Sequence, residues 1–321
     1  MARSLTRRVV PLAATLIAVS FLTFLLTSLL PGDPAVQILG PQGATPEAVA
    51  RVRADLHLDD PLLVRYARWV GDVAQGDLGR SYRTGQEVRD AIGERLPVTL
   101  EIGGMAIVFA LLGAIPLGML SAYRAGGGVD RAVTGTSFAL LAVPSFMMAI
   151  VLILVFAEQL GWAPATGWVR LSDDVGDNLR GAVLPALSIS IGELAVYTRL
   201  LRSDTIATLQ EDYISLARAK GMPTFWILLR HALRPSSFSL LTVVGLQIGA
   251  IMSGSVLIET LFALPGVGRL LVDSIYQRDL VMVQGIALVV AVSYVVVNFA
   301  VDIVYTYLDP RIRRGRAAAR A

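Results

Sequence analysis

Apolar residues in this 321-residue chain fall into long unbroken blocks rather than short periodic runs. A helix needs about 20 apolar residues to cross the hydrocarbon core of a bilayer, and its backbone amides must be satisfied within the segment. The pattern therefore predicts an all-α polytopic membrane protein with six transmembrane helices. The predicted spans cover residues 9–30, 102–123, 132–157, 182–201, 235–258 and 280–301.

Three of these blocks carry features that bear on the count. The first follows three arginines, as in a secretory signal, but it exceeds the roughly 7–15 residues of a signal core, and PGDPA follows it rather than a cleavage site. We interpret it as an uncleaved anchor. Pro116 and Pro144 interrupt the second and third blocks, where they either kink a helix or mark irregular packing.

The polar segments between the blocks predict an orientation. Basic residues are concentrated at the N-terminus, in the loops after the second and fourth spans, and in the tail 309–321. Six spans place all four segments on the cytoplasmic side, together with both termini, whereas five or seven would not. The arginines of the tail either meet anionic lipid or form a disordered cytoplasmic extension.

Residues 31–97 then lie outside the cytoplasm. Thr45-Pro46 and Asp60-Pro61 each place a capping side chain before a proline, which predicts helix starts. The segment is either a solvated connector or, as we favour, a folded cap that meets a partner. The predicted organisation is an N-terminal tail with the first helix (1–30), the extracytoplasmic segment (31–97), a core domain (98–308) and the basic tail (309–321).

Composition narrows the function. Hydrophobic residues make up 55% of the chain and charged residues only 17%, against about a quarter in soluble domains. The chain has no cysteine, and its net charge of +3 is too small to argue for nucleic acid. Its two histidines, His57 and His231, fall on opposite sides of the predicted topology, so we expect no shared metal site.

An energy source for transport is absent from the sequence. A phosphate-binding P-loop needs lysine directly after glycine, but the only lysine, Lys220, follows Ala219. No nucleophile elbow or intramembrane serine–histidine pair is visible, so we predict no catalytic residues. Polar residues in the spans could line a solute path, although hydrogen bonds between helices are their commoner role. The candidates are Glu193, Gln247, Ser253, Ser255 and Asn298.

The loop 202–235 after the fourth span is basic and amphipathic. We predict that Asp204 caps a helix that starts at Thr205, and that this helix stops at Gly221, the residue type that best tolerates a left-handed helix end. Ala217 would let a partner's backbone approach closely. Such a helix either lies in a partner's groove or rests on lipid headgroups.

The string EDYISLARAKG at 211–221, followed by RHALRP, resembles the ABC importer permeases of the dipeptide/oligopeptide/nickel family. It is a partial match to the wider EAA-loop signature: Ala217 and Gly221 fit, while Ser215 and Leu216 depart from it. Further stretches resemble the same family in order along nearly the whole chain. They are LLPGDPA at 29–35, GDLGRS at 76–81, RLPVTLE at 95–101, ETLFALPGVG at 259–268, QRD at 277–279 and DPRIR at 309–313.

This resemblance implies a type I importer permease fold, and the long N-terminal segment points to the first of two permease subunits. It implies a bacterial inner-membrane protein that forms half of a peptide path with a second homologous permease, cytoplasmic ATPases and an extracytoplasmic binding protein. The chain would hold no cofactor, with ATP and Mg on the ATPases. The helix implied to couple to them contains Glu211, Asp212, Tyr213, Leu216, Ala217, Arg218, Ala219, Lys220 and Gly221.

Three alternatives remain open at this stage. The same family includes nickel and glutathione importers, so the solute is not fixed by the resemblance. From the residues alone, a secondary transporter or channel that works without partners is also possible. An intramembrane enzyme is a weaker alternative.

Overall fold

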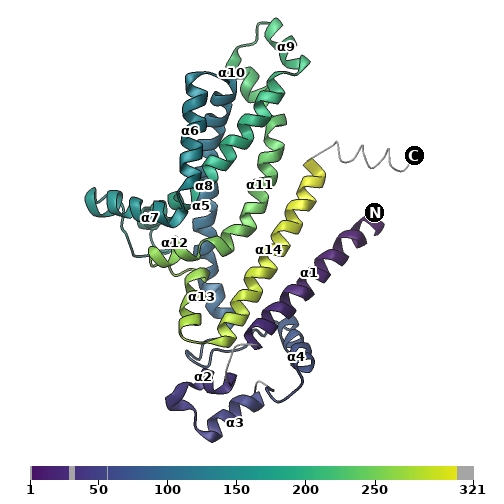
Figure 1. Ribbon diagram of the computed structural model, residues 1–321, viewed down its shortest axis with the longest axis vertical. Helices are drawn as coiled ribbons and strands as arrows, with labels where there is room; N and C mark the ends of the chain where they lie inside the picture. Colours follow the sequence, from purple (N-terminus) through teal and green to yellow (C-terminus); the bar gives the residue numbers. More distant parts are fainter. Residues whose placement is uncertain (1, 29–32, 56, 309–321) are drawn as a thin grey trace. The chain divides into compact units, whose positions relative to one another are not determined.

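The computed structural model describes residues 2–28, 33–55 and 57–308, and every regular element among them is a helix. The chain divides into two compact units, each built from two stretches of sequence. Unit 1 comprises residues 1–99 and 265–299, and unit 2 comprises residues 100–264 and 300–321. Figure 1 shows the helices coloured along the chain. The all-α prediction is confirmed for the described residues.

Unit 1 combines the N-terminal helix, three short helices and parts of two long ones. Its helices are α1 Ala2–Ser28, α2 Pro34–Gly43, α3 Pro46–Asp55, α4 Leu62–Ala74, the start of α5 Val88–Tyr123, α13 Val267–Tyr276 and α14 Leu280–Leu308 as far as Phe299. The segment predicted to be folded between the first two spans therefore contains three helices of its own.

Both predicted proline starts in this segment begin helices, but only one is capped as expected. Thr45 Oγ1 accepts a hydrogen bond from the Ala48 amide at 3.2 Å, directly before α3. Asp60 does not cap α4, because its carboxylate forms an ion pair with Arg68 instead. Asp33 caps α2 by accepting from the Ala35 amide at 2.9 Å.

Aromatic side chains hold α4 against α1, as Figure 1 shows for the two helices. The Tyr66 ring lies edge-on to Phe21, with 5.1 Å between ring centroids, and its hydroxyl is 2.7 Å from Ser20 Oγ. Trp69 and Phe24 pack beside this pair at a centroid distance of 5.5 Å. Because such rings bury a large apolar area at a defined geometry, they fix α4 along α1.

A second core in unit 1 joins the start of α5 to α13 and α14. Its buried residues are Val88, Ala91, Ile92, Val267, Leu270, Met282 and Ile286. Two sequence stretches that the family resemblance singled out meet here: Ser81 of GDLGRS donates a hydrogen bond to the Asp279 carboxylate of QRD. Asp279 also accepts from the Met282 amide at 3.2 Å and so caps α14.

Gly285 marks a close approach of α14 to α5 and gives a first prediction. A Cβ at Gly285 would lie 2.4 Å from Val88 Cγ1, and a β-branched side chain in a helix has little freedom to move away. We expect Gly285→Ala to lower the free energy of unfolding by about 1–3 kcal/mol, measured by SDS titration in mixed micelles. Gly135→Ala is the matched helical control, because its Cβ would meet nothing within 4 Å. Equal stability of the two variants would contradict this packing.

Unit 2 contains the remaining helices, with α8 in contact with α6, α7 and α11. They are the rest of α5, α6 Gly128–Ala142, α7 Ser145–Leu152, the π-helix η1 Ile153–Gln159, α8 Val175–Leu209, α9 Asp212–Ala219, α10 Thr224–Trp226, the π-helix η2 Ile227–Ala232, α11 Leu233–Gly254 and α12 Val256–Leu261. The buried core is formed by Ala110, Ala114, Met119, Tyr197, Leu201, Ala232 and Leu240.

The predicted third span is broken at Pro144, one of the two alternatives that the sequence left open for this proline. The chain bends by 98° between α6 and the pair formed by α7 and η1. Val143 is extended (ψ 119°) and Pro144 precedes the new helix, because proline disfavours the helical conformation of the residue before it. Pro116, by contrast, lies inside an unbroken α5.

The count of six spans is matched only in part. Within the described residues, α5, α8 and Leu280–Val301 of α14 are long and apolar enough to cross a membrane, and the bent pair makes a fourth if it is one span. The first predicted span contributes a shorter apolar stretch, Pro11–Leu25. The end of that predicted span and the tail 309–321 lie outside the described residues.

Candidate functional site

The loop after the predicted fourth span forms a short helix, but its start differs from the prediction. We expected Asp204 to cap a helix from Thr205; instead α8 continues through both residues to Leu209. Thr205 is fully buried, and its hydroxyl contacts Met119 Sδ at 3.3 Å. Packing inside unit 2 therefore keeps this turn in α8, and the weak capping tendency of Asp204 does not end it.

The short helix α9 begins one turn later. Glu211 stands extended before it, and Asp212 occupies its first turn, where the partial positive charge of the helix end stabilises a carboxylate. Its end is the one predicted: Gly221 is left-handed (φ +73°). The Met222 amide bonds to the Ala217 carbonyl at 3.2 Å and the Gly221 amide to Arg218 at 2.9 Å, the hydrogen-bond pair of a Schellman motif.

One face of α9 is buried against its own chain. Ile214 is fully buried and Ala217 is 6% exposed, and both pack with Ile227 of η2. We had expected Ala217 to let a partner's backbone approach closely. Because Ala217 is buried, it does not do so. Its small side chain instead lets α9 lie close to the rest of unit 2.

Two large side chains of α9 are exposed beside this buried face, and the hydroxyl of one of them, Tyr213, donates a hydrogen bond to the His231 carbonyl at 3.4 Å. Tyr213 is 44% exposed and Leu216 is 56% exposed. Partial burial and the neighbouring Glu211 raise the pKa of Tyr213, so its hydroxyl stays protonated at neutral pH. The remaining predicted coupling residues are also exposed: Glu211, Asp212, Arg218, Ala219, Lys220 and Gly221. One face of α9 is thus fixed to unit 2, while Tyr213 and Leu216 remain exposed among charged residues. Such a helix can bind in a groove of a partner protein.

A buried ion pair joins the base of this region to the preceding helices, and the sequence analysis missed it. Arg202 of α8 contacts both carboxylate oxygens of Asp130, at 2.5 and 2.7 Å. Asp130 is 4% exposed and also accepts from Ser121 Oγ (2.6 Å) and the Gly126 amide (2.8 Å). Asp130 and Arg202 are 72 residues apart, and nothing local in the sequence relates them.

The candidate path residues are not all brought together. Within unit 2, the Gln247 amide donates to the Glu193 carboxylate. Ser255 instead donates to Glu259 at 2.8 Å. Asn298 belongs to unit 1, where its Oδ1 is buried with no hydrogen-bond partner among the described residues. The side chain of Ser253 lies outside the described part of the chain.

Glu259 is a buried carboxylate that the sequence analysis passed over. It is fully buried and lies at the start of the ETLFALPGVG stretch, which the sequence analysis used only for the family resemblance. The sequence could have indicated this residue, because Glu259 lies among apolar residues in the short helix α12. A carboxylate in apolar surroundings is costly and is often functional. Among the described residues, no group of three or more histidine, aspartate or glutamate side chains could hold a metal ion.

Comparison with known proteins identifies the family. Residues 114–314 match the family described as "Binding-protein-dependent transport system inner membrane component", and residues 1–103 match the N-terminal part of such components. This chain is 40% identical to a Brucella abortus protein that is named as a permease protein of a peptide transport system. The similarity covers 98% of this chain and 99% of the relative.

Two further relatives are similar over nearly their whole length. The di/tripeptide transport system permease protein of Pseudomonas aeruginosa is 37% identical, with coverage of 97% of this chain and 99% of the relative. The glutathione transport system permease protein of Salmonella paratyphi A is 36% identical, with coverage of 96% and 97%. This chain therefore belongs to the family of inner membrane components of binding-protein-dependent transport systems and is a permease subunit of an ABC importer.

Proposed function

We propose that this permease forms half of the path by which an ATP-driven importer moves di- and oligopeptides across the bacterial inner membrane. The observation that carries the substrate class is similarity over nearly the full length to permeases named for peptides. The glutathione relative keeps glutathione as the alternative solute. Nickel, the other alternative, would have to cross without imidazole ligands from the spans, because both histidines fall outside the predicted helices.

The energy for transport comes from separate ATPase subunits that grip α9. Tyr213 and Leu216 form the apolar centre of the docking face, since they are exposed on a helix whose other face is fixed. Ile214 and Ile227 join α9 to η2, which continues into α11. Movement of a docked ATPase then shifts α9 together with these helices, as a rigid-body switch between two access states.

The same proposal includes the membrane topology and the other subunits of the transporter. Six spans, with α1 and α11 completing the set, place both termini and α9 in the cytoplasm and residues 31–97 outside. A second homologous permease completes the path, and an extracytoplasmic binding protein delivers solute. Glu193 with Gln247, and the serines and Asn298 named above, are the residues proposed to face the path. ATP and Mg bind to the ATPases and not to this chain.

Reconstitution tests this proposal. Proteoliposomes containing both permeases and the ATPases should take up a labelled dipeptide only when the binding protein is outside and ATP is on the ATPase side. The same vesicles without the ATPases should take up none, whatever ion gradient is imposed. Uptake driven by an ion gradient through this chain alone would show a stand-alone transporter instead.

The end of α9 gives a second prediction. Gly221 is left-handed, and any side chain there costs about 1–2 kcal/mol, so Gly221→Trp should distort the last turn and displace the exposed face. We expect at least a several-fold loss of ATP-driven uptake per ATP hydrolysed. Gly161→Trp is the matched control, because Gly161 is also left-handed (φ +63°) with open space around it but lies outside α9. Normal coupling in the Gly221 variant would count against the assignment of α9.

A further inference from the structure

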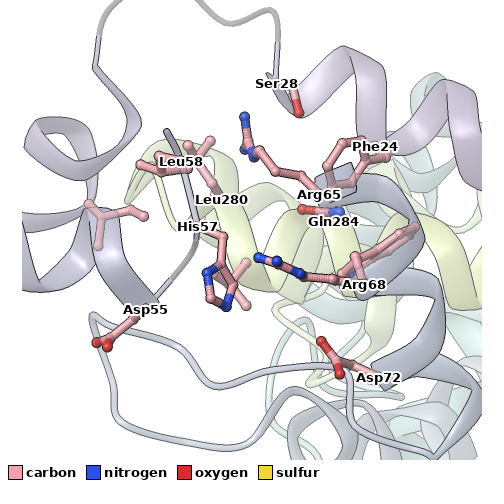
Figure 2. Close-up of a pocket in the computed structure, with 13 residues that line it drawn as sticks. Phe24, Ser28, Asp55, His57, Leu58, Arg65, Arg68, Asp72, Leu280 and Gln284 are labelled. Atoms are coloured by element: carbon pink, nitrogen blue, oxygen red, sulfur yellow. The ribbon is translucent and has the colours of Figure 1, made fainter. Parts of the chain in front are cut away.

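A pocket in unit 1 has a chemistry that neither the family nor the proposed transport path assigns. It has a volume of about 150 Å³ and is lined by α1, α2, the end of α3 and the loop after it, α4 and the start of α14. This is well above the space that a single water molecule needs, so the pocket has room for a small polar ligand group. Figure 2 shows its polar side chains.

One wall of the pocket carries two buried donors that have no hydrogen-bond partner among the described residues. They are Arg65 Nε and Gln284 Nε2, both from residues that line the pocket. The Arg65 guanidinium lies 5.6 Å from the centre of the Phe24 ring, and Figure 2 shows these three side chains together. A buried donor without an acceptor is costly, so an acceptor supplied by a ligand would stabilise this wall.

The charge of Arg65 selects the kind of acceptor. Burial lowers the pKa of Arg65 below its usual value, but a guanidinium remains charged at neutral pH. Guanidinium groups bind carboxylate and phosphate oxygens with short, charge-assisted hydrogen bonds. The second arginine of the pocket, Arg68, is already paired with Asp60. Arg65 and Gln284 therefore define an anion-binding end.

The other end of the pocket is acidic. Asp55 and Asp72 lie away from Arg65 in Figure 2, on opposite sides of the view with His57 and Arg68 between them, and neither forms an ion pair with any described residue. Ser28, His57 and several apolar side chains, among them Trp69, complete the lining. A ligand with only a negative charge would leave these carboxylates unmatched, whereas one with an ammonium group at the far end would satisfy both ends.

We propose that this pocket binds a small zwitterion, with its anionic group at Arg65 and Gln284 and its primary ammonium at one of the two carboxylates, Asp55 or Asp72. Two sources share this chemistry: the headgroup of phosphatidylethanolamine and the free termini of a short peptide. Access from the extracytoplasmic side rests on the proposed function, which places residues 31–97 there.

The test uses the whole transporter purified with its partner subunits. In the lipid arm, native mass spectrometry compares retention of phosphatidylethanolamine with that of phosphatidylcholine, whose quaternary ammonium cannot donate hydrogen bonds. In the peptide arm, calorimetry compares glycylglycine with N-acetyl-glycylglycine, in the absence of the binding protein. We expect wild type to prefer the primary ammonium in one arm, which identifies the source.

Variants assign the binding to this pocket. Arg65→Met and Gln284→Glu should each weaken binding about tenfold or more, since each removes a donor to the anionic group. Arg51→Met, an exposed arginine of α3 outside the pocket, should bind as wild type does. Arg65→Lys keeps the charge and should retain part of the affinity, which separates lost binding from misfolding.

Three results would overturn the proposal. The first is that wild type binds neither zwitterion, and the second is that it binds phosphatidylcholine or N-acetyl-glycylglycine as tightly as the matching ligand with a primary ammonium. The third is that Arg65→Met and Gln284→Glu keep the wild-type affinity. ATP-driven uptake is measured on the same preparations. Failure of zwitterion binding with uptake intact rejects this pocket alone, whereas failure of uptake in wild type rejects the proposed function.

Discussion

Replacing Asp130 with asparagine is expected to lower the free energy of unfolding of this permease by about 3 kcal/mol, because it breaks a buried ion pair and leaves one partner charged. Arg202 keeps only 29% of its side chain exposed, and Asp130 keeps 6%. The guanidinium in the variant would lose its carboxylate while most of the Arg202 side chain stays buried. Removal of one partner from such a pair costs more than removal of both.

The asparagine also reverses part of the hydrogen bonding. Both oxygens of Asp130 act as acceptors, from Arg202, Ser121 and the Gly126 amide. The side chain of asparagine has only one acceptor oxygen. Its NH₂ group would replace the second oxygen of Asp130 and would face a group that is itself a hydrogen-bond donor. At least one donor is therefore left unsatisfied in a buried position, which adds to the lost charge.

The measurement is SDS titration in mixed micelles, followed by circular dichroism. Asp173→Asn is the control, since that carboxylate is exposed in a loop and its loss should change stability by less than about 0.5 kcal/mol. The double variant Asp130→Asn with Arg202→Gln should lose less than the sum of its single variants, by about 1–3 kcal/mol. If Asp130→Asn unfolds with the same midpoint as Asp173→Asn, the pair does not stabilise the protein.

This pair illustrates what the sequence could not provide. Asp130 and Arg202 are 72 residues apart, and Glu193 and Gln247 are 54 residues apart. Hydropathy and loop charge describe each segment by itself, so they assign such residues to a span or a loop without naming a partner. Ser81 and Asp279, at a separation of 198, were in two stretches singled out by resemblance, yet their hydrogen bond was not expected.

Features set by the local chain were predicted better. Gly221 was placed at the end of α9 because a left-handed residue there favours glycine, whatever surrounds it. The cap at Asp204 failed because burial of Thr205 and the residues around it outweighs a capping preference of about 1 kcal/mol. Pro144 was identified as a possible break, but the 98° bend depends on what α6 and α7 pack against.

The same limit applies to the faces of α9. The spacing of its apolar residues identified an amphipathic helix, but it could not show which residues turn inward. Ala217 was assigned to a partner and is buried in its own unit, while Leu216, one residue earlier, is 56% exposed. The burial of each side chain therefore separates residues that hold α9 in place from residues that are free to dock.

That distinction leads to the prediction with the largest effect on transport. Leu216→Glu should leave folding nearly unchanged, because the side chain is exposed in this chain and substitutions at such positions usually change stability by less than about 0.5 kcal/mol. In the assembled transporter the same position is proposed to fill the centre of the ATPase groove. A buried, unpaired glutamate there should weaken docking by at least about 2 kcal/mol, or roughly thirtyfold.

The experiment compares ATPase co-purification and ATP-driven dipeptide uptake for Leu216→Glu, Leu216→Met and Ile275→Glu. Leu216→Met keeps an apolar side chain and should retain docking, whereas Ile275→Glu adds the same charge at an equally exposed apolar residue (55%) outside α9 and should retain the ATPase. If Leu216→Glu holds its ATPase as wild type does while Gly221→Trp is uncoupled, the groove contacts the charged end of α9 and not its apolar centre. If Leu216→Glu and Gly221→Trp both behave as wild type does, α9 is not the coupling element. In that case neither ATPase co-purification nor ATP-driven uptake depends on the exposed part of this helix.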